Sequence, residues 1–193
     1  MTLDKNQIYV IDDFLSLKDQ KSLLDDIVYS GTPKTYIFTN TSYDQNSPSY
    51  ILPEKQFVNV QHTKNYILGV LENKMNLEVD EIFRIKTNWI FRELESKKDY
   101  IYPPHVDQDN ISHWVLLYYV NDSDGDTILY NETENDFSLN DLISQFPNLT
   151  IKHKFTPKQG RAILFWGNRF HCGMPPVTSD FRILINHNFT IKE

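Results

Sequence analysis

One short pattern of residues in this sequence could bind a metal ion. His105 and Asp107 stand two positions apart in the stretch YIYPPHVD at 100–107. In an extended strand, side chains two apart point to the same face, and their Cα atoms lie about 6.6 Å apart. An imidazole nitrogen and a carboxylate oxygen then reach the same ion. A third ligand from another strand would complete a face of two histidines and one carboxylate with open positions opposite, which suits Fe(II) in non-haem sites.

We expect His171, which lies far downstream, to be the third ligand. His153 is the rival candidate, but it stands in a charged IKHK run and lacks the downstream arginine that follows His171. Cys172 is adjacent to His171, so in a strand it would point to the opposite face, and it is interpreted as a packing residue. The other histidines have no partner at ligand spacing and are interpreted as structural or surface residues: His62, His113 and His187.

Length and composition predict a single globular domain over residues 1–193. The chain is long enough for a substantial core, and 40% of it is hydrophobic and 13% aromatic. Its net charge of −7 makes nucleic acid an unexpected partner. We expect no signal peptide and no membrane span, because no apolar run is long enough. A lone cysteine excludes an internal disulfide and favours a cytoplasmic location.

The first 80 residues or so are predicted to be largely helical. Residues 7–15 read as a short strand and a turn, after which Ser16 is the expected N-cap of a helix that ends at Gly31-Thr-Pro. The polar stretch 39–54 is predicted to be a long surface loop, either a passive connection or a cover over substrate. A second helix is expected over 57–75, with these core positions: Val60, Tyr66, Ile67, Val70, Leu71 and Met75.

Residues 81–191 predict a β-rich core. The stretch around His105 is expected to be extended, and 138–146 is a candidate short helix. The acidic turn 121–126 does not fit a calcium loop, because Val120 and Asn131 would stand at its first and last ligand positions. Further strands are expected at 81–94, 113–120, 127–130, 151–155, 161–167 and 181–191. The pattern predicts a mainly β, α+β fold, a jelly roll with N-terminal helices packed on one sheet.

The last predicted strand has two different faces. One face, from Phe181 to Phe189, is mostly apolar. The other carries Arg182, Leu184, Asn186 and Asn188. An inward face with an arginine and two asparagines would be costly to bury unless something polar binds there. A bound dicarboxylate would resolve this conflict.

The spacing of His105, Asp107, His171 and Arg182, which follows His171 by eleven positions, resembles the Fe(II)/2-oxoglutarate-dependent dioxygenases. The closest likeness is to their prolyl 4-hydroxylase-like branch. The likeness covers most of the chain and includes four further segments: VIDDFLS at 10–16, YYVN at 118–121, GDTILY at 125–130 and the run PKQGRAILF at 157–165. The resemblance implies a double-stranded β-helix.

The sequence departs from the family pattern at three positions. Asp126 stands where the branch often has a second glycine. Leu184 stands where many relatives carry serine or threonine, and Asn186 replaces a hydroxyl residue that helps to hold the cosubstrate in some relatives. These departures affect the contacts to the cosubstrate rather than the metal ligands.

The resemblance implies that His105, Asp107 and His171 hold Fe(II) and that Arg182 binds the distal carboxylate of 2-oxoglutarate. A guanidinium group suits this role because it can pair with a carboxylate through two parallel hydrogen bonds. Tyr119 and Asn186 are further candidates for the cosubstrate contact, with core packing as the alternative. O2 is the second cosubstrate, and ascorbate is a candidate reductant.

The implied activity is hydroxylation of an organic substrate with release of succinate and CO2. The branch implies a prolyl residue in a peptide or protein. A free amino acid, another small molecule or a nucleobase stays open, the last being disfavoured by the acidic charge. The carboxylate of Asp107 argues against a halogenase. A non-catalytic jelly-roll protein that only binds a metal or serves a structural role is the alternative from another class. The sequence does not indicate an oligomeric state.

Overall fold

The structure, a computed structural model, describes residues 3–28, 58–108, 111–136 and 148–192. The predicted loop at 39–54, the helix end at Gly31 and the candidate helix at 138–146 lie outside these residues. The described elements, in chain order, are β1 (Tyr9–Ile11), α1 (Leu17–Val28), α2 (Val58–Met75), β2 (Val79–Phe91), the 3-10 turn η2 (Glu95–Lys97), β3 (Trp114–Tyr119), β4 (Thr127–Thr133), the 3-10 turn η3 (Glu134–Asp136), β5 (Ile151–Phe155), β6 (Ala162–Trp166), β7 (Arg169–Gly173) and β8 (Phe181–Ile191).

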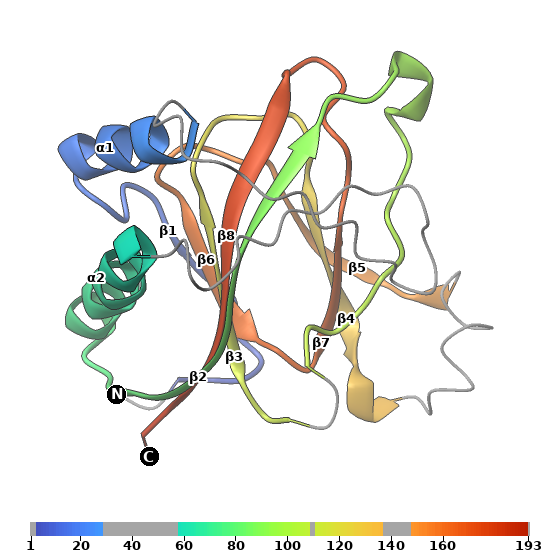
Figure 1. Cartoon of the computed structure of the whole chain (residues 1–193). Helices are drawn as coiled ribbons and strands as arrows, with labels where there is room; N and C mark the ends of the chain where they lie inside the picture. Colours follow the sequence, from blue (N-terminus) through green and yellow to red (C-terminus); the bar gives the residue numbers. More distant parts are fainter. Residues whose placement is uncertain (1–2, 29–57, 109–110, 137–147, 193) are drawn as a thin grey trace.

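The strands form two antiparallel sheets. The larger sheet has the order β1-β6-β3-β8-β2, and the smaller one has the order β5-β4-β7. In Figure 1, α1 and α2 lie together on one side of the larger sheet, and the smaller sheet lies on its other side. The predicted mainly β, α+β architecture with the helices on one sheet is therefore confirmed. No described helix is long and apolar enough to cross a membrane.

The outer core packs the helices against the larger sheet. Ser16 caps α1 as predicted, because its hydroxyl oxygen accepts the backbone N–H of Asp19 at 3.2 Å. The predicted core positions of α2 are right for Ile67 and Leu71, which are fully buried, but wrong for Tyr66, whose hydroxyl instead donates to Asp19 at 2.6 Å. Leu68, two positions after Tyr66, is buried instead, and the predicted Val70 and Met75 pack against the same core.

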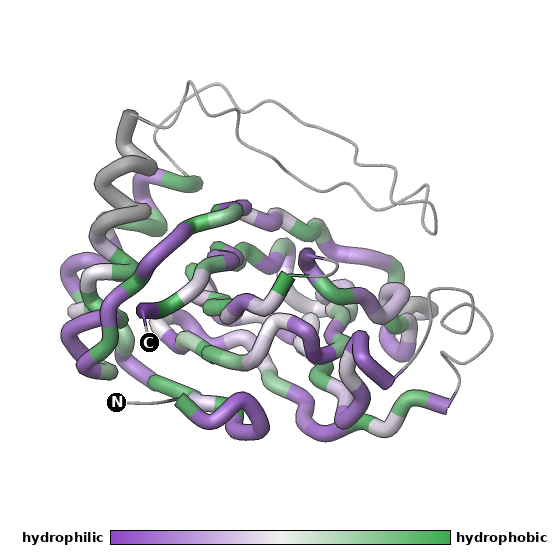
Figure 2. Tube along the Cα trace, turned by 90° about the horizontal axis from the view of Figure 1, so that it is seen from below, coloured by the Kyte–Doolittle hydropathy of each residue, from purple (hydrophilic) through white to green (hydrophobic). Residues whose placement is uncertain are grey.

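The inner core lies between the two sheets. Val115, Leu117 and Tyr119 project from β3 into it, while Leu116 and Tyr118 project from the same strand into the outer core. Both faces of β3 are therefore buried, which explains its nearly continuous apolar sequence. Figure 2 shows hydrophobic and hydrophilic stretches interspersed along the chain.

Strand β8 shows the two faces that its sequence predicts. Ile183, Ile185 and Phe189 pack in the outer core. Arg182 and Asn186 belong to the opposite face and are nevertheless buried, at 2% and 4% exposure. This polar face lies toward the space between the sheets, where the residues of the predicted metal site are found.

The turn between β3 and β4 holds the segment that leads into β8. The Asp124 carboxylate accepts backbone N–H groups from residues 177, 178 and 179 at 3.0, 2.9 and 2.9 Å. Asn121 accepts the N–H of Ile183 at 2.8 Å and donates to the carbonyl of Phe181 at 3.0 Å. The acidic turn thus serves as a clamp on the chain, and it places the first residues of β8, including Arg182.

We predict that Asp124→Asn weakens the fold by about 1–3 kcal/mol at pH 7, because three charge-assisted hydrogen bonds lose the charge of their acceptor. Burial alone would raise the pKa of Asp124, but the three N–H groups lower it below its ordinary value of 3.8. A lowered folded-state pKa stabilises the fold above the ordinary value, and that stability is lost as the pH falls through the folded-state pKa.

Urea unfolding at pH 7 and at about pH 3 checks this prediction, and the difference between wild type and Asp124→Asn should shrink at the lower pH. Asp25→Asn, a change of an exposed residue on α1, is the matched control and should have little effect at either pH. An equal loss of stability at both pH values would contradict the proposed role of the Asp124 charge.

Candidate metal centre

The segment that carries His105 joins the smaller sheet through a single bridge. The backbone N–H of His105 donates to the carbonyl of His171 at 2.9 Å, and the reverse bond measures 3.0 Å. The prediction of a regular strand at 105–107 is therefore wrong. The two prolines before His105 lack N–H donors, so a hydrogen-bonded ladder cannot extend through them. The bridge brings the two histidines together, and a further bond from the N–H of Tyr102 to the carbonyl of Gly173 at 3.0 Å ties the same segment to β7.

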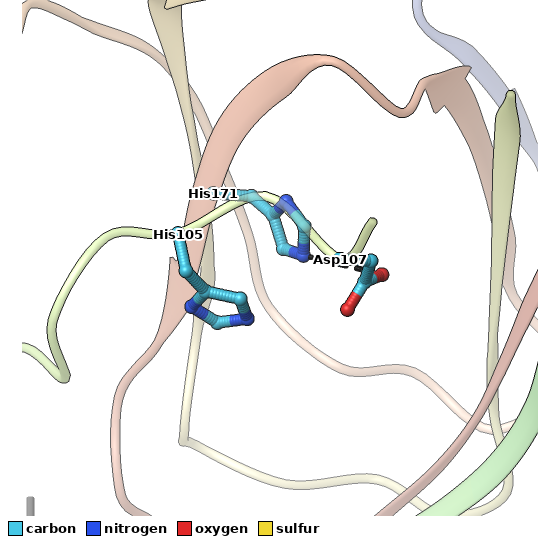
Figure 3. A group of neighbouring side chains, drawn as sticks. All are labelled: His105, Asp107 and His171. Carbon is cyan, nitrogen blue, oxygen red and sulfur yellow. Dashed lines mark ion pairs between the residues drawn. The ribbon is translucent and has the colours of Figure 1, made fainter. Parts of the chain in front are cut away.

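The three predicted ligands lie together in the structure. One ligand atom from each of His105, Asp107 and His171 falls within 4.8 Å of the other two. The Nε2 atom of His171 lies 3.6 Å from an oxygen of Asp107, and the two imidazole ring centres are 4.7 Å apart. Figure 3 shows the His171 ring and the Asp107 carboxylate pointing toward each other. This is the one such cluster among the residues that the structure describes.

Backbone carbonyl groups select the ring nitrogen that each histidine presents. The Nδ1 atom of His105 lies 3.1 Å from the carbonyl oxygen of Pro103, and the Nδ1 atom of His171 lies 3.2 Å from that of Arg169. A carbonyl only accepts hydrogen bonds, so each Nδ1 carries the proton. Each Nε2 atom then has a free lone pair, as a metal ligand needs.

Asp107 is held by residues from two strands of the larger sheet. Arg84 on β2 forms an ion pair with its Oδ1 atom. Asn186 and Asn188 on β8 donate to its Oδ2 atom at 2.8 and 3.1 Å, and Asn188 also donates to the Asn186 side-chain oxygen at 2.8 Å. These contacts fix the carboxylate although it belongs to a segment without regular secondary structure. Such support is what orients metal ligands in proteins.

The charges in the cluster favour the protonation states that bind a cation. Burial alone would raise the pKa of the Asp107 carboxyl, but His171 and the Arg84 guanidinium lower it well below its usual value. Burial among neighbouring groups, together with His171, lowers the pKa of His105. His105 is also exposed to solvent, which reduces the effect of burial on its pKa. The site therefore offers an ionised carboxylate and a neutral imidazole near pH 7, and its donor set fits a divalent metal.

The described histidines that were not expected to be ligands lie away from the cluster. His153 lies on β5 and is exposed, and β4 separates it from β7, because Leu129 pairs with both His153 and His171. His113 and His187 are fully buried and do not belong to the cluster. Cys172 packs in a separate apolar group behind the smaller sheet, as its parity predicts. The side chain of His62 lies outside the described residues.

Arg182 is a buried cation in need of an anion. Its side chain donates to the hydroxyl oxygen of Thr127, which also accepts a hydrogen bond from Tyr119 at 2.7 Å. Its Nε atom has no hydrogen-bond partner, and no carboxylate of the described residues forms an ion pair with it. Burial lowers the pKa of the guanidinium, which reflects the cost of the charge there. A ligand carboxylate would remove this cost.

Sequence reasoning missed four residues that build the site. Arg84 contacts Asp107, and Thr127 contacts Arg182. Asn188 was expected on the polar face, but its hydrogen bond to Asp107 was not predicted. Gly173 leaves the space for Arg182, because a Cβ atom there would lie 2.6 Å from a guanidinium nitrogen. Polar residues at alternate positions of β2 were the only signal for Arg84. The side chain of Asn186 donates a hydrogen bond to Asp107. Its contact to the cosubstrate stays a prediction.

We predict that His105→Ala, Asp107→Ala and His171→Ala each weaken binding of a divalent metal at least about 100-fold, because each removes one donor from a three-donor site. Anaerobic titration with Fe(II), followed by calorimetry, measures this affinity. His153→Ala is the matched control and should bind as wild type does. Unchanged affinity in His171→Ala would refute the site and make His153 the next candidate.

Comparison with known proteins supports the fold. No protein-family model and no curated protein matches the sequence. Among solved structures, the non-haem α-ketoglutarate-dependent epimerase SnoN of nogalamycin biosynthesis matches with a TM-score of 0.67 at 8% identity, over 96% of this chain and 78% of that one. HygX from Streptomyces hygroscopicus, solved with nickel and 2-oxoglutarate, has a TM-score of 0.62 at 12% identity over 96% and 83%.

A third match is a prolyl hydroxylase from Trichoplax adhaerens in complex with a peptide fragment of hypoxia-inducible factor. Its TM-score is 0.59 at 14% identity, over 96% of this chain and 84% of that one. The three proteins share one scaffold, although SnoN is an epimerase and the Trichoplax protein is a prolyl hydroxylase. The chain therefore has the fold of the 2-oxoglutarate-dependent non-haem iron oxygenases, the superfamily that its sequence motifs resemble.

Proposed function

We propose that this chain is an Fe(II)- and 2-oxoglutarate-dependent dioxygenase that hydroxylates an organic substrate, built as one domain on a double-stranded β-helix. The observation that carries the proposal is the position of His105, Asp107 and His171, whose ligand atoms converge within 4.8 Å on a scaffold shared with such enzymes. A buried arginine without an anionic partner on the same inward face adds to it.

Each residue has a role that follows from its contacts. His105 and His171 would hold the iron through Nε2, and Asp107 would hold it through a carboxylate oxygen that Arg84, Asn186 and Asn188 keep in place. When bound, iron and 2-oxoglutarate would supply the oxidising chemistry, in which O2 is consumed and the cosubstrate is converted to succinate and CO2. The chain itself supplies two imidazole nitrogens and one ionised carboxylate from one side of the site.

Arg182 would bind the distal carboxylate of 2-oxoglutarate. Thr127 and Tyr119 orient its guanidinium by a shared hydrogen bond network, so the planar group is already arranged for a two-pronged contact. The unpartnered Nε atom provides a further donor. Tyr119 is fully buried and reaches the same hydroxyl, so we retain it as a residue that assists the cosubstrate contact.

The proposed substrate is a prolyl residue in a peptide or protein. A prolyl residue in a peptide is supported by the motifs of the prolyl 4-hydroxylase-like branch and by the fold shared with a prolyl hydroxylase. The fold is also shared with SnoN, an epimerase of nogalamycin biosynthesis, so a small-molecule substrate is the alternative. We place the enzyme in the cytoplasm, because its single cysteine fits a reducing compartment.

Formation of succinate from 2-oxoglutarate tests the proposal directly. We predict that the purified chain with Fe(II), ascorbate and O2 produces succinate, that a suitable substrate increases the rate and gains 16 mass units, and that Asp107→Ala abolishes both. Mass spectrometry over peptide and small-molecule pools measures the products. Tight metal binding without succinate under any of these conditions would favour the non-catalytic metal-binding alternative.

A second prediction concerns the cosubstrate. Arg182→Ala should raise the Kd for 2-oxoglutarate about 30- to 1000-fold, because it removes a charge-assisted bidentate contact of about 2–4 kcal/mol. Arg182→Lys keeps the charge without the planar fork and should have a smaller effect. Gly173→Ala should act in the same direction, because its methyl group would displace the guanidinium. All three should leave metal affinity nearly unchanged, and an unaltered Kd in Arg182→Ala would contradict the assignment.

A further inference from the structure

Two cations on β2, Arg84 and Lys86, lie beside the metal centre. In the antiparallel register of β2 and β8, Arg84 stands opposite Asn188, and Lys86 stands opposite Asn186. Directly opposite residues project from the same face of a sheet. Since both asparagines contact Asp107, Arg84 and Lys86 belong to the inward face at the level of the metal ligands.

Lys86 has no partner for its charge in the part of the chain that the structure describes. Arg84 is occupied by Asp107, whereas the Lys86 ammonium makes no hydrogen bond or ion pair there. The residue is half-buried. Burial lowers its pKa and the Arg84 guanidinium lowers it further, while Asp107 acts in the opposite direction. A half-buried cation beside another cation is unfavourable unless an anion binds it.

The inward face carries more positive than negative charge. Three described cations face this region: Arg84, Lys86 and Arg182. Asp107 is paired with Arg84, and Asp126 is near enough to Arg182 to act on its pKa. A divalent ion would add two positive charges, and 2-oxoglutarate would add two negative ones. An excess of positive charge therefore persists at Lys86 after the metal and the cosubstrate have bound.

We propose that Lys86, supported by Arg84, binds a carboxylate group of the organic substrate beside the metal centre. The inference rests on the proposed oxygenase function and narrows its substrate to molecules that carry a carboxylate. Charge attraction to Lys86 would hold the substrate on the β2 side of the ligands, so this residue would determine specificity rather than take part in the oxidation.

The carboxylates of 2-oxoglutarate have other partners under the proposed function. Arg182 takes the distal one, and the charge of the metal ion itself balances the one at the keto-acid end. Along β8, Arg182 and Asn186 are four positions apart, or about 13 Å in an extended strand. Lys86 stands at the Asn186 end of this distance, so the cation that holds the distal carboxylate and the cation at the metal level are separate.

Acetate is a suitable probe for this subsite, with acetamide as its uncharged match. The protein is loaded with Mn(II), which does not support turnover, and with 2-oxoglutarate, and the relaxation of the acetate methyl protons is measured by NMR. We expect saturable enhancement for acetate and none for acetamide. Lys86→Met should weaken acetate binding about tenfold or more, and Lys86→Arg should stay within about threefold of wild type.

Two controls separate this role from general charge or folding effects. Lys74→Met removes an exposed cation at the end of α2, in the helical layer, and should leave acetate binding unchanged. Lys86→Met should also unfold at the wild-type temperature or above, because it removes an unpaired charge. Acetate binding that is equal in wild type and Lys86→Met overturns the proposal. A loss of 2-oxoglutarate affinity in Lys86→Met with unchanged acetate binding also overturns it, because Lys86 would then serve the cosubstrate.

A metal-free measurement distinguishes failure of this inference from failure of the proposed function. Acetate is titrated into metal-free protein with 13C-labelled lysine, and the Lys86 signal is identified by its absence in Lys86→Met. If wild type binds neither Mn(II) nor Fe(II), the oxygenase proposal fails, and with it the assignment of the anion to a substrate. If the metal binds but the Lys86 signal does not respond to acetate, the subsite alone is refuted.

Discussion

The carboxylate of Asp107 is the point on which the site depends. It is almost fully buried, and it belongs to a segment that has only one bridge to a sheet. A buried carboxylate without partners would be strongly destabilising, so its two oxygens must be satisfied from elsewhere. They are satisfied by β2 and β8, which are neighbours in the larger sheet but lie about ninety positions apart in the chain. The same contacts that make burial tolerable also hold the ligand in one orientation.

This requirement explains why the space between the sheets is divided. One part is filled by apolar side chains from β3, β4 and β6, which exclude water and tie the sheets together. The other part is lined by the polar faces of β2 and β8. Polar groups are stronger binding partners when water is excluded around them, so the apolar part raises the strength of each contact in the polar part. The clamp formed by Asn121 and Asp124 then places the start of β8, on which Arg182 stands.

The residues of this site differ in how far they could be predicted from the sequence. His105, Asp107, His171 and Arg182 could be found because spacing and parity are properties of the sequence itself. The polar face of β8 was also predictable, because a period of two is easily seen in eleven residues. Arg84 could not be assigned, because its contact depends on the register between β2 and β8, which no local pattern specifies. The bridge at His105 was mistaken for a strand, because the prolines that keep a segment extended also prevent its pairing.

The distribution of charge adds a constraint on how this molecule would recognise an anion. The whole chain is acidic, with a net charge of −7, yet two of its cations, Arg84 and Lys86, lie on the inward face beside Asp107. At physiological ionic strength, interactions across the solvent are screened beyond about 8 Å, so the acidic surface has little effect on what binds inside. Within the partly desolvated space between the sheets the screening is weaker, and an unpaired ammonium there acts strongly over a short range. Recognition of an anionic ligand would therefore be local, set by the geometry of β2 and β8 rather than by the overall charge of the chain.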